Sequence, residues 1–260
     1  MKQSNLSVQW ISFTTILRKE VNRFLRIWGQ TILPAVINQS LYFLIFGAFI
    51  GSQVGEIQGV SYMGFIIPGL IMMSIIRNSF NNVVSSFFGA KFQRQIEELL
   101  VSPTSSLVLI CGYTSGGILR GLIVGSVVYL VSMVFESPTI EHPFIVLLFG
   151  ILTATVFSLG GFINAVFAKN FDDISIFLNF VLTPLTYLGG VFYSISMLPE
   201  QFQTLSKFNP ILYMVDGFRY GFYGIADLNI EMSIAVLATL VLLLGVICWI
   251  LLEKGLGMRS

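Results

Sequence analysis

The side chains best placed to act on a partner lie in a short charged segment, residues 88–103, between two long apolar stretches. Its charged and amide residues are Lys91, Arg94, Gln95, Glu97 and Glu98. Its apolar residues recur at steps of three and four, as Phe88, Phe92, Ile96 and Leu99 do. This spacing predicts one amphipathic helix with a charged face, which Ser102 and Pro103 end while starting the next helix. Such a face suits docking to another protein, although a plain surface helix has the same pattern.

A second group of polar side chains lies inside an apolar stretch, residues 57–90. It contains Arg77, Asn78 and Asn82, and an arginine at membrane depth costs at least about 2.5 kcal/mol unless it pairs, meets water or reaches the interface. The face of Asn78 and Asn82 could line a translocation path or a subunit interface. It could equally bond to a neighbouring helix, with Arg77 reaching toward the inner interface.

The next stretch, residues 99–135, combines one arginine with closely spaced small residues. Its glycines include Gly112, Gly116, Gly117, Gly121 and Gly125. Glycines four residues apart allow helices to approach closely, so this stretch is predicted to pack tightly. Arg120 lies among them with no obvious carboxylate at the same depth, so its expected partner is a carbonyl, water or substrate.

Several kinds of chemistry lack the residues they require. The sequence has no Gly-x-x-x-x-Gly-Lys-Ser/Thr phosphate loop, so no ATP site of that kind is expected. One histidine, His142, and two cysteines within apolar stretches favour neither a metal site nor a disulfide. An intramembrane enzyme would need paired catalytic groups, and a secondary transporter would usually have an acidic residue within a span. A net charge of +1 gives no indication of nucleic-acid binding. We therefore predict no catalytic residue, metal or cofactor in this chain.

The elements that carry these residues are membrane helices. The 260 residues are 55% hydrophobic and only 10% charged, far from the composition of a soluble domain. Stretches long enough to cross a bilayer are 27–55, 57–90, 99–135, 142–168, 174–199 and 232–252. None alternates as a barrel strand would, so the expected fold is all-α with six transmembrane helices.

The positive residues predict how the chain is oriented. If both termini are cytoplasmic, ten of the fourteen Lys and Arg residues lie on the inner side, Lys2 and Arg259 among them. Residues 8–29 should form an amphipathic helix in the inner interface, because an aromatic and aliphatic stripe faces four basic residues.

The last third of the chain is irregular and aromatic. Pro184 and the pair Gly189 and Gly190 interrupt the fifth stretch, and residues 195–230 then form two short helical pieces separated by Pro199 and Asn209-Pro210. Such pieces are too short to cross a bilayer, so a re-entrant helical region on the outer side is expected. Tyr213, Phe218 and Tyr220 are candidates for an outer gate. An aromatic belt that anchors the outer interface is the simpler explanation.

These features together resemble the ABC-2 type permease family, and within it the bacterial inner-membrane exporters. The resemblance covers essentially the whole chain. It rests on six spans, an amphipathic opening helix, the sequence Glu-Glu-Leu-Leu-Val-Ser-Pro at 97–103 and the sequence Leu-Thr-Pro-Leu-Thr-Tyr-Leu-Gly-Gly-Val-Phe-Tyr at 182–193, which leads to Pro199 and Pro210. One departure is Arg94-Gln95-Ile96, where many relatives carry a Gly-Thr step.

The resemblance implies that membrane transport and ATP hydrolysis are carried out by different subunits. In that family the permease is a single membrane domain, here residues 1–260, and two copies pair in the bacterial inner (cytoplasmic) membrane. Separate ATPase subunits hold ATP and magnesium and dock on the coupling helix, which corresponds here to Lys91, Phe92, Arg94, Gln95, Ile96, Glu97 and Glu98. The expected cargo is an amphiphilic, lipid-linked, glycan or drug-like molecule moved outward. A secondary transporter or channel independent of ATP remains the alternative.

Overall fold

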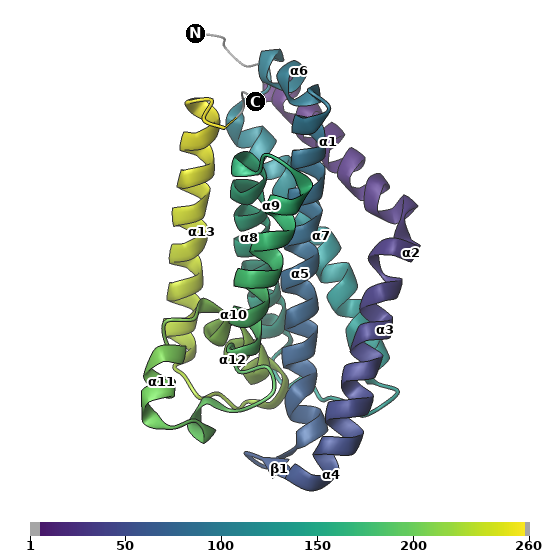
Figure 1. Cartoon of the computed structure of the whole chain (residues 1–260), viewed down its shortest axis with the longest axis vertical. Coiled ribbons are helices and arrows are strands. Elements are labelled where there is room, and N and C mark those ends of the chain that lie inside the picture. The colour runs from purple at the N-terminus through teal and green to yellow at the C-terminus, as the bar shows by residue number, and fades with distance from the viewer. Residues whose placement is uncertain (1–5, 258–260) are drawn as a thin grey trace.

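The structure is a computed structural model that describes residues 6–257, and it is a bundle of long helices (Figure 1). Five helical stretches are long and apolar enough to cross a membrane: 28–54, Tyr62–Phe92, Ser106–Ser132, Pro143–Phe167 and Ile230–Glu253. The remaining predicted span, residues 174–199, is shorter than expected. It is a composite helix made of α9 (Phe171–Ile176), a π-helical stretch η2 (Phe177–Leu182) and α10 (Thr183–Tyr187).

The helix formed by the fifth stretch ends before its two adjacent glycines, whereas Pro184 lies within the helix. Pro184 lies in the first turn of α10, directly after the π-helical stretch, where the Thr183 N–H reaches back to Leu178 O. The helix therefore continues through Pro184. It ends before Gly189 and Gly190, and Gly190 has a φ of 73°. The predicted extension to residue 199 is wrong, because 188–199 form turns and the short 3₁₀ helix η3 (Ile195–Met197).

The opening helix α1 (Leu6–Arg26) slants across one end of the bundle (Figure 1). It is followed by α2 (Trp28–Thr31), α3 (Leu33–Tyr42), the π-helix η1 (Phe43–Ile50) and α4 (Gly51–Val54), which run down the bundle as the first span. A hairpin of β1 (Glu56–Ile57) and β2 (Val60–Ser61) turns the chain back. Gln58 and Gly59 form this turn with φ values of 54° and 81°, as a two-residue hairpin requires.

The second span, α5 (Tyr62–Phe92), is the centre of the bundle. It packs along α7 (Ser106–Ser132) and α8 (Pro143–Phe167), and most of its length is buried. The close packing predicted for the glycines is present. A Cβ at Gly121 would overlap Ser79 of α5 and lie 3.2 Å from Ile75 O. Small residues thus bring the backbones of α7 and α5 together.

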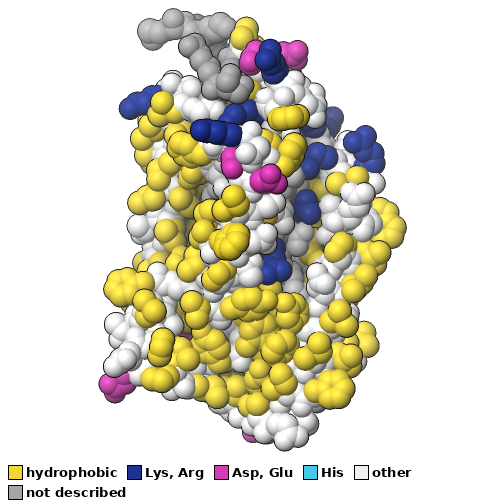
Figure 2. Space-filling model, in the orientation of Figure 1, with side chains coloured by type: hydrophobic (Ala, Val, Ile, Leu, Met, Phe, Trp, Pro, Cys, Tyr) yellow, Lys and Arg dark blue, Asp and Glu magenta, His cyan; other side chains and the backbone are white. Residues whose placement is uncertain are grey.

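The two ends of the bundle differ in character. The end that carries the start of α1 and the end of α13 (Ile230–Glu253) also carries the short helix α6 (Gln95–Val101), and Lys and Arg side chains gather toward it above a broad apolar surface (Figures 1 and 2). Lys2 and Arg259 lie outside the described residues. The opposite end carries the hairpin, α11 (Glu200–Ser206) and α12 (Pro210–Tyr223). Two helical pieces divided at Pro199 and Asn209-Pro210 therefore occur as predicted.

Candidate functional site

The predicted coupling segment forms two helices instead of one. The second span continues to Phe92, and α6 begins at Gln95. Between them Arg94 adopts a left-handed conformation with φ of 60°. The chain therefore turns a corner at Arg94, which the unbroken periodicity could not indicate.

This corner changes which side chains share a face. Ile96 is 1% exposed and anchors α6, whereas Phe92 is 64% exposed and does not continue the buried stripe. Gln95, Glu97 and Glu98 are exposed on α6. No ion pair joins Arg94 to Glu97 or Glu98 in residues 6–257. These charges are thus available to a partner.

The junction after α6 also differs from the prediction. Ser102 ends α6, and its hydroxyl donates to Leu99 O at 2.6 Å. The next helix begins at Ser106 and is capped by Ser105, whose hydroxyl accepts from Val108 N. Pro103 therefore belongs to the connection and not to the first turn of α7.

Lys91 is engaged within the chain. Its Nζ donates to Val166 O at 2.6 Å and to Ala168 O at 3.0 Å. These carbonyls belong to the end of α8, where a cation also complements the helix dipole. Lys91 thus ties the end of α5 to the end of α8.

The polar face of α5 is covered by α1. Ser86 donates to Glu20 Oε1, and Asn82 Nδ2 donates to Glu20 Oε2 at 3.2 Å. Arg23 lies 3.0 Å from the same carboxylate oxygen and also donates to Asn82 O and Oδ1, both at 2.9 Å. Glu20 is completely buried. The opening helix therefore holds an ion pair between a buried carboxylate and a partly exposed guanidinium against the second span, a contact of the kind expected if this face packs within the chain.

Asn78 and Arg77 take no part in that cluster. Asn78 Nδ2 donates to Ser74 O within its own helix at 3.0 Å. Arg77 lines a small cavity of about 150 Å³ with Asn81 and with residues 178–183 of the composite helix. Arg77 and Asn82 are thus on different sides of α5, and the candidate path residues do not form one surface.

Arg120 lies in α7 and is buried, with 9% exposed. Its Nε has no hydrogen-bond partner in the described part of the chain. Gly116, one turn earlier on α7, contacts Glu20, since a Cβ there would lie 2.5 Å from Glu20 Cβ. A carboxylate therefore approaches this part of α7 after all, and it comes from the opening helix.

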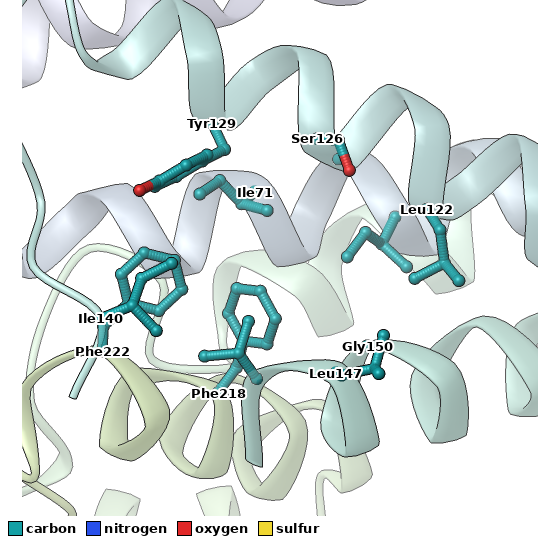
Figure 3. Close-up of a pocket in the computed structure, with 12 residues that line it drawn as sticks. Ile71, Leu122, Ser126, Tyr129, Ile140, Leu147, Gly150, Phe218 and Phe222 are labelled. Carbon is teal, nitrogen blue, oxygen red and sulfur yellow. The ribbon is translucent and has the colours of Figure 1, made fainter. Parts of the chain in front are cut away.

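The three outer aromatic candidates point to three different surroundings. Phe218 of α12 lines a cavity of about 240 Å³ bounded by α5, α7, α8 and α12, together with Phe222, Tyr129 and Gly150 (Figure 3). Tyr213 donates its hydroxyl to Lys207 O at 2.9 Å. Tyr220 stacks on His142 with ring centroids 5.2 Å apart. Only Phe218 therefore borders a cavity that could be gated.

Two charged residues of α12 form an internal network that the sequence did not reveal. Arg219 lies within the predicted outer region and is 3% exposed, with its guanidinium carbon 3.8 Å from the centroid of the Phe65 ring. Its NH2 donates to Gly190 O at 2.7 Å. Burial lowers the pKa of Arg219 to about 10, so it remains charged at neutral pH.

Asp216 is the second charged residue of this network. Its two carboxylate oxygens accept from the backbone N–H groups of Asp227 and Leu228, each at 2.9 Å. Asp227 in turn accepts from Ser194 Oγ and Ile195 N. The outer region is thus connected by charged hydrogen bonds from α12 to η3. Asp216 and Arg219 at a spacing of three residues were the only sequence signal.

The two cysteines differ in exposure, since Cys248 is buried and Cys111 is exposed on α7. The composite helix begins with Asp172 and Asp173 in the first turn of α9, and Asn170 caps that helix.

Comparison with known proteins shows the family of this chain. The family model for the ABC-2 type transporter matches residues 11–223, from α1 to the end of α12. The chain is 53% identical over 255 residues to the inner membrane transport permease YadH of Escherichia coli (strain K12), which covers 98% of this chain and 100% of that protein. It is 23% identical over 238 residues to nodulation protein J of Rhizobium leguminosarum bv. viciae, with 88% and 90% of the two chains covered.

Proposed function

Because this chain belongs to the ABC-2 type transporter family, we propose that it is a permease subunit that moves its substrate outward with energy from a separate ATPase. It is a multi-pass membrane protein similar to an inner membrane permease. In this proposal two permease copies pair with each other, and separate ATPase subunits that hold ATP and magnesium dock on their cytoplasmic side. The proposed cargo is an amphiphilic, lipid-linked, glycan or drug-like molecule.

The geometry of α6 supports this proposal best. The helix presents Gln95, Glu97 and Glu98 to solvent while Ile96 anchors it. It is joined by one corner to α5, which packs against both α7 and α8. A displacement of α6 would therefore act directly on the helix at the centre of the bundle, as rigid-body transmission between packed helices requires.

The exposed surface of α6 defines the test. We expect a permease with Glu97→Lys and Glu98→Lys to lose co-purification of its ATPase subunit, because the acidic surface becomes basic. Glu200→Lys in α11 is the matched control, since it reverses an exposed acid at the opposite end of the bundle. An unchanged complex in the double variant would argue against docking at α6.

Secondary transport can be separated from ATP-driven transport by its energy source. Glu20 is a buried carboxylate of the kind that proton-coupled transporters use, but it already pairs with Arg23. We therefore expect transport into vesicles to stop with vanadate and to persist with an uncoupler. The reverse pattern would favour a transporter independent of ATP.

A further inference from the structure

A cavity at the α6 end of the bundle combines apolar walls with basic side chains. It has a volume of about 790 Å³ and lies between the end of α5, the end of α8 and the segment after α13. Its residues are Phe88, Lys91, Phe92, Arg94, Val166, Phe167, Ala168, Lys169, Leu256 and Gly257. This size is within the range of about 300–1,000 Å³ found for small-molecule sites.

The rim of this cavity has aromatic side chains that the fold leaves uncovered. Phe92 is 64% exposed and Phe167 is 60% exposed. Phe171, from the first turn of α9, is also exposed and lies with its ring centroid 5.4 Å from that of Phe92. Exposed aromatic rings at the end of a span are typical of the boundary between hydrocarbon and headgroups.

The charges in the cavity are positive. Lys91 donates to two carbonyls of α8, while Arg94 and Lys169 are exposed beside it. The acids nearest in sequence are Glu97 and Glu98 after Arg94, and Asp172 and Asp173 after Lys169. No ion pair joins Arg94 to Glu97 or Glu98 within residues 6–257, and Asp173 Oδ2 is already bonded to the Lys169 N–H at 2.8 Å. The cavity thus offers cationic groups next to exposed rings that can contact acyl chains.

We propose that this cavity binds one anionic phospholipid of the inner leaflet, with its phosphate near Arg94 and Lys169 and its upper acyl chains against Phe92 and Phe167. Charge complementarity selects this occupant over a zwitterionic lipid, because basic pockets beside membrane helices on the cytoplasmic side attract acidic headgroups. The proposal depends on the inward placement of this end in the proposed function. A bound lipid would connect α5 and α8 next to α6.

The test compares lipids on purified full-length permease without any ATPase. The probe is fluorescent phosphatidylglycerol, titrated into permease held in phosphatidylcholine nanodiscs. We expect the double variant R94Q/K169Q to bind it roughly 30-fold more weakly, as about 1 kcal/mol for each surface cation implies. The matched control R18Q/K19Q removes two exposed cations from α1 and should leave the affinity unchanged.

Three outcomes would overturn the proposal. The first is unchanged affinity in R94Q/K169Q or an equal loss in the control. The second is equal binding of labelled phosphatidylcholine, or full competition by soluble glycerol phosphate, which would indicate a site for free phosphate. The third is loss of ATPase co-purification with retained lipid binding in R94Q/K169Q, which would assign this surface to the ATPase. The lipid titration uses permease without any ATPase and a different pair of substitutions, so an unchanged complex in the Glu97 and Glu98 variant would contradict only docking at α6, and the two proposals fail separately.

Discussion

Glu20 and Asn82 join the opening helix to the second span, with Asn82 Nδ2 donating to Glu20 Oε2 at 3.2 Å. The two residues are 62 positions apart, and Arg23 closes the cluster from the same helix as Glu20. The opening helix is therefore attached to the second span by a charged contact as well as by apolar packing. Removing one member of such a contact leaves the other charge uncompensated.

We expect Glu20→Ala to destabilise the protein by about 1–3 kcal/mol, because Arg23, Asn82 and Ser86 would lose a completely buried carboxylate partner. Thermal unfolding in detergent should show a clear decrease in Tm. The exposed Arg18, on the same helix, provides the control Arg18→Ala with little change. Equal Tm values for both variants would show that the cluster contributes no stability.

Adjacent glycines of α8 allow a direct test of helix packing. A Cβ at Gly161 would lie 2.7 Å from Phe80 O and 3.3 Å from Phe80 Cα, whereas a Cβ at Gly160 would meet nothing within 4 Å. We expect Gly161→Ala to cost about 1–3 kcal/mol through overpacking against a backbone that cannot move aside. Gly160→Ala should be neutral or stabilising by up to about 1 kcal/mol, since alanine favours the helix. The unfolding midpoint of Gly161→Ala should therefore fall below that of the unmodified protein, while that of Gly160→Ala should stay the same or rise.

The corner at Arg94 is expected to prefer glycine. A left-handed conformation costs an ordinary residue about 1–2 kcal/mol and costs a β-branched residue more. Arg94→Gly should therefore retain or slightly raise stability, whereas Arg94→Val should lower it and loosen α6. Hydrogen exchange of residues 95–101 measures the second effect directly. Faster exchange in the glycine variant than in the valine variant would contradict a strained corner.

The internal network of α12 requires an arginine and not only a positive charge. Arg219 donates to Gly190 O, reaches Phe65 O at 3.4 Å and covers the Phe65 ring, which one ammonium group cannot do together. We expect Arg219→Lys to destabilise the outer region and to increase its cleavage by added protease. Lys207→Arg is the matched control, because Lys207 is exposed in the same region. Equal cleavage of both variants would mean that Arg219 does not hold this region together.

The sequence predicted more of the architecture than of the site. Apolar length identified five spans, glycine spacing predicted the approach of α7 to α5, and motifs indicated the correct family. The continuation of the composite helix through Pro184, the corner at Arg94 and the burial of Arg219 were not predicted, for a common reason. Their positions depend on a single backbone angle or on a distant partner, and periodicity contains neither.

Glu20 is a further residue whose contacts could not be predicted from the sequence pattern. On the sequence it is one polar residue of an amphipathic helix, with nothing to pair it to Asn82 and Ser86 on the second span. The contact of this carboxylate with the second span was therefore not predicted, because Glu20 comes from a helix outside the spans. Tertiary packing alone reveals such a contact.

The cavity beside Phe218 provides the final prediction, because it separates a gate from an anchoring belt. Gly150 borders the cavity, and a Cβ there would lie 3.3 Å from the flexible Leu122 side chain and 3.8 Å from Phe218 (Figure 3). Gly150→Leu should therefore fill the space without striking the backbone. If the cavity opens during transport, this variant should lose most transport at normal expression, while Gly160→Leu on the open side of the same helix should retain it. Tyr213 and Tyr220 lie elsewhere, so their alanine variants should affect transport less than Phe218→Ala does. Full transport in the Gly150→Leu protein would leave Phe218 as a packing residue of the outer region.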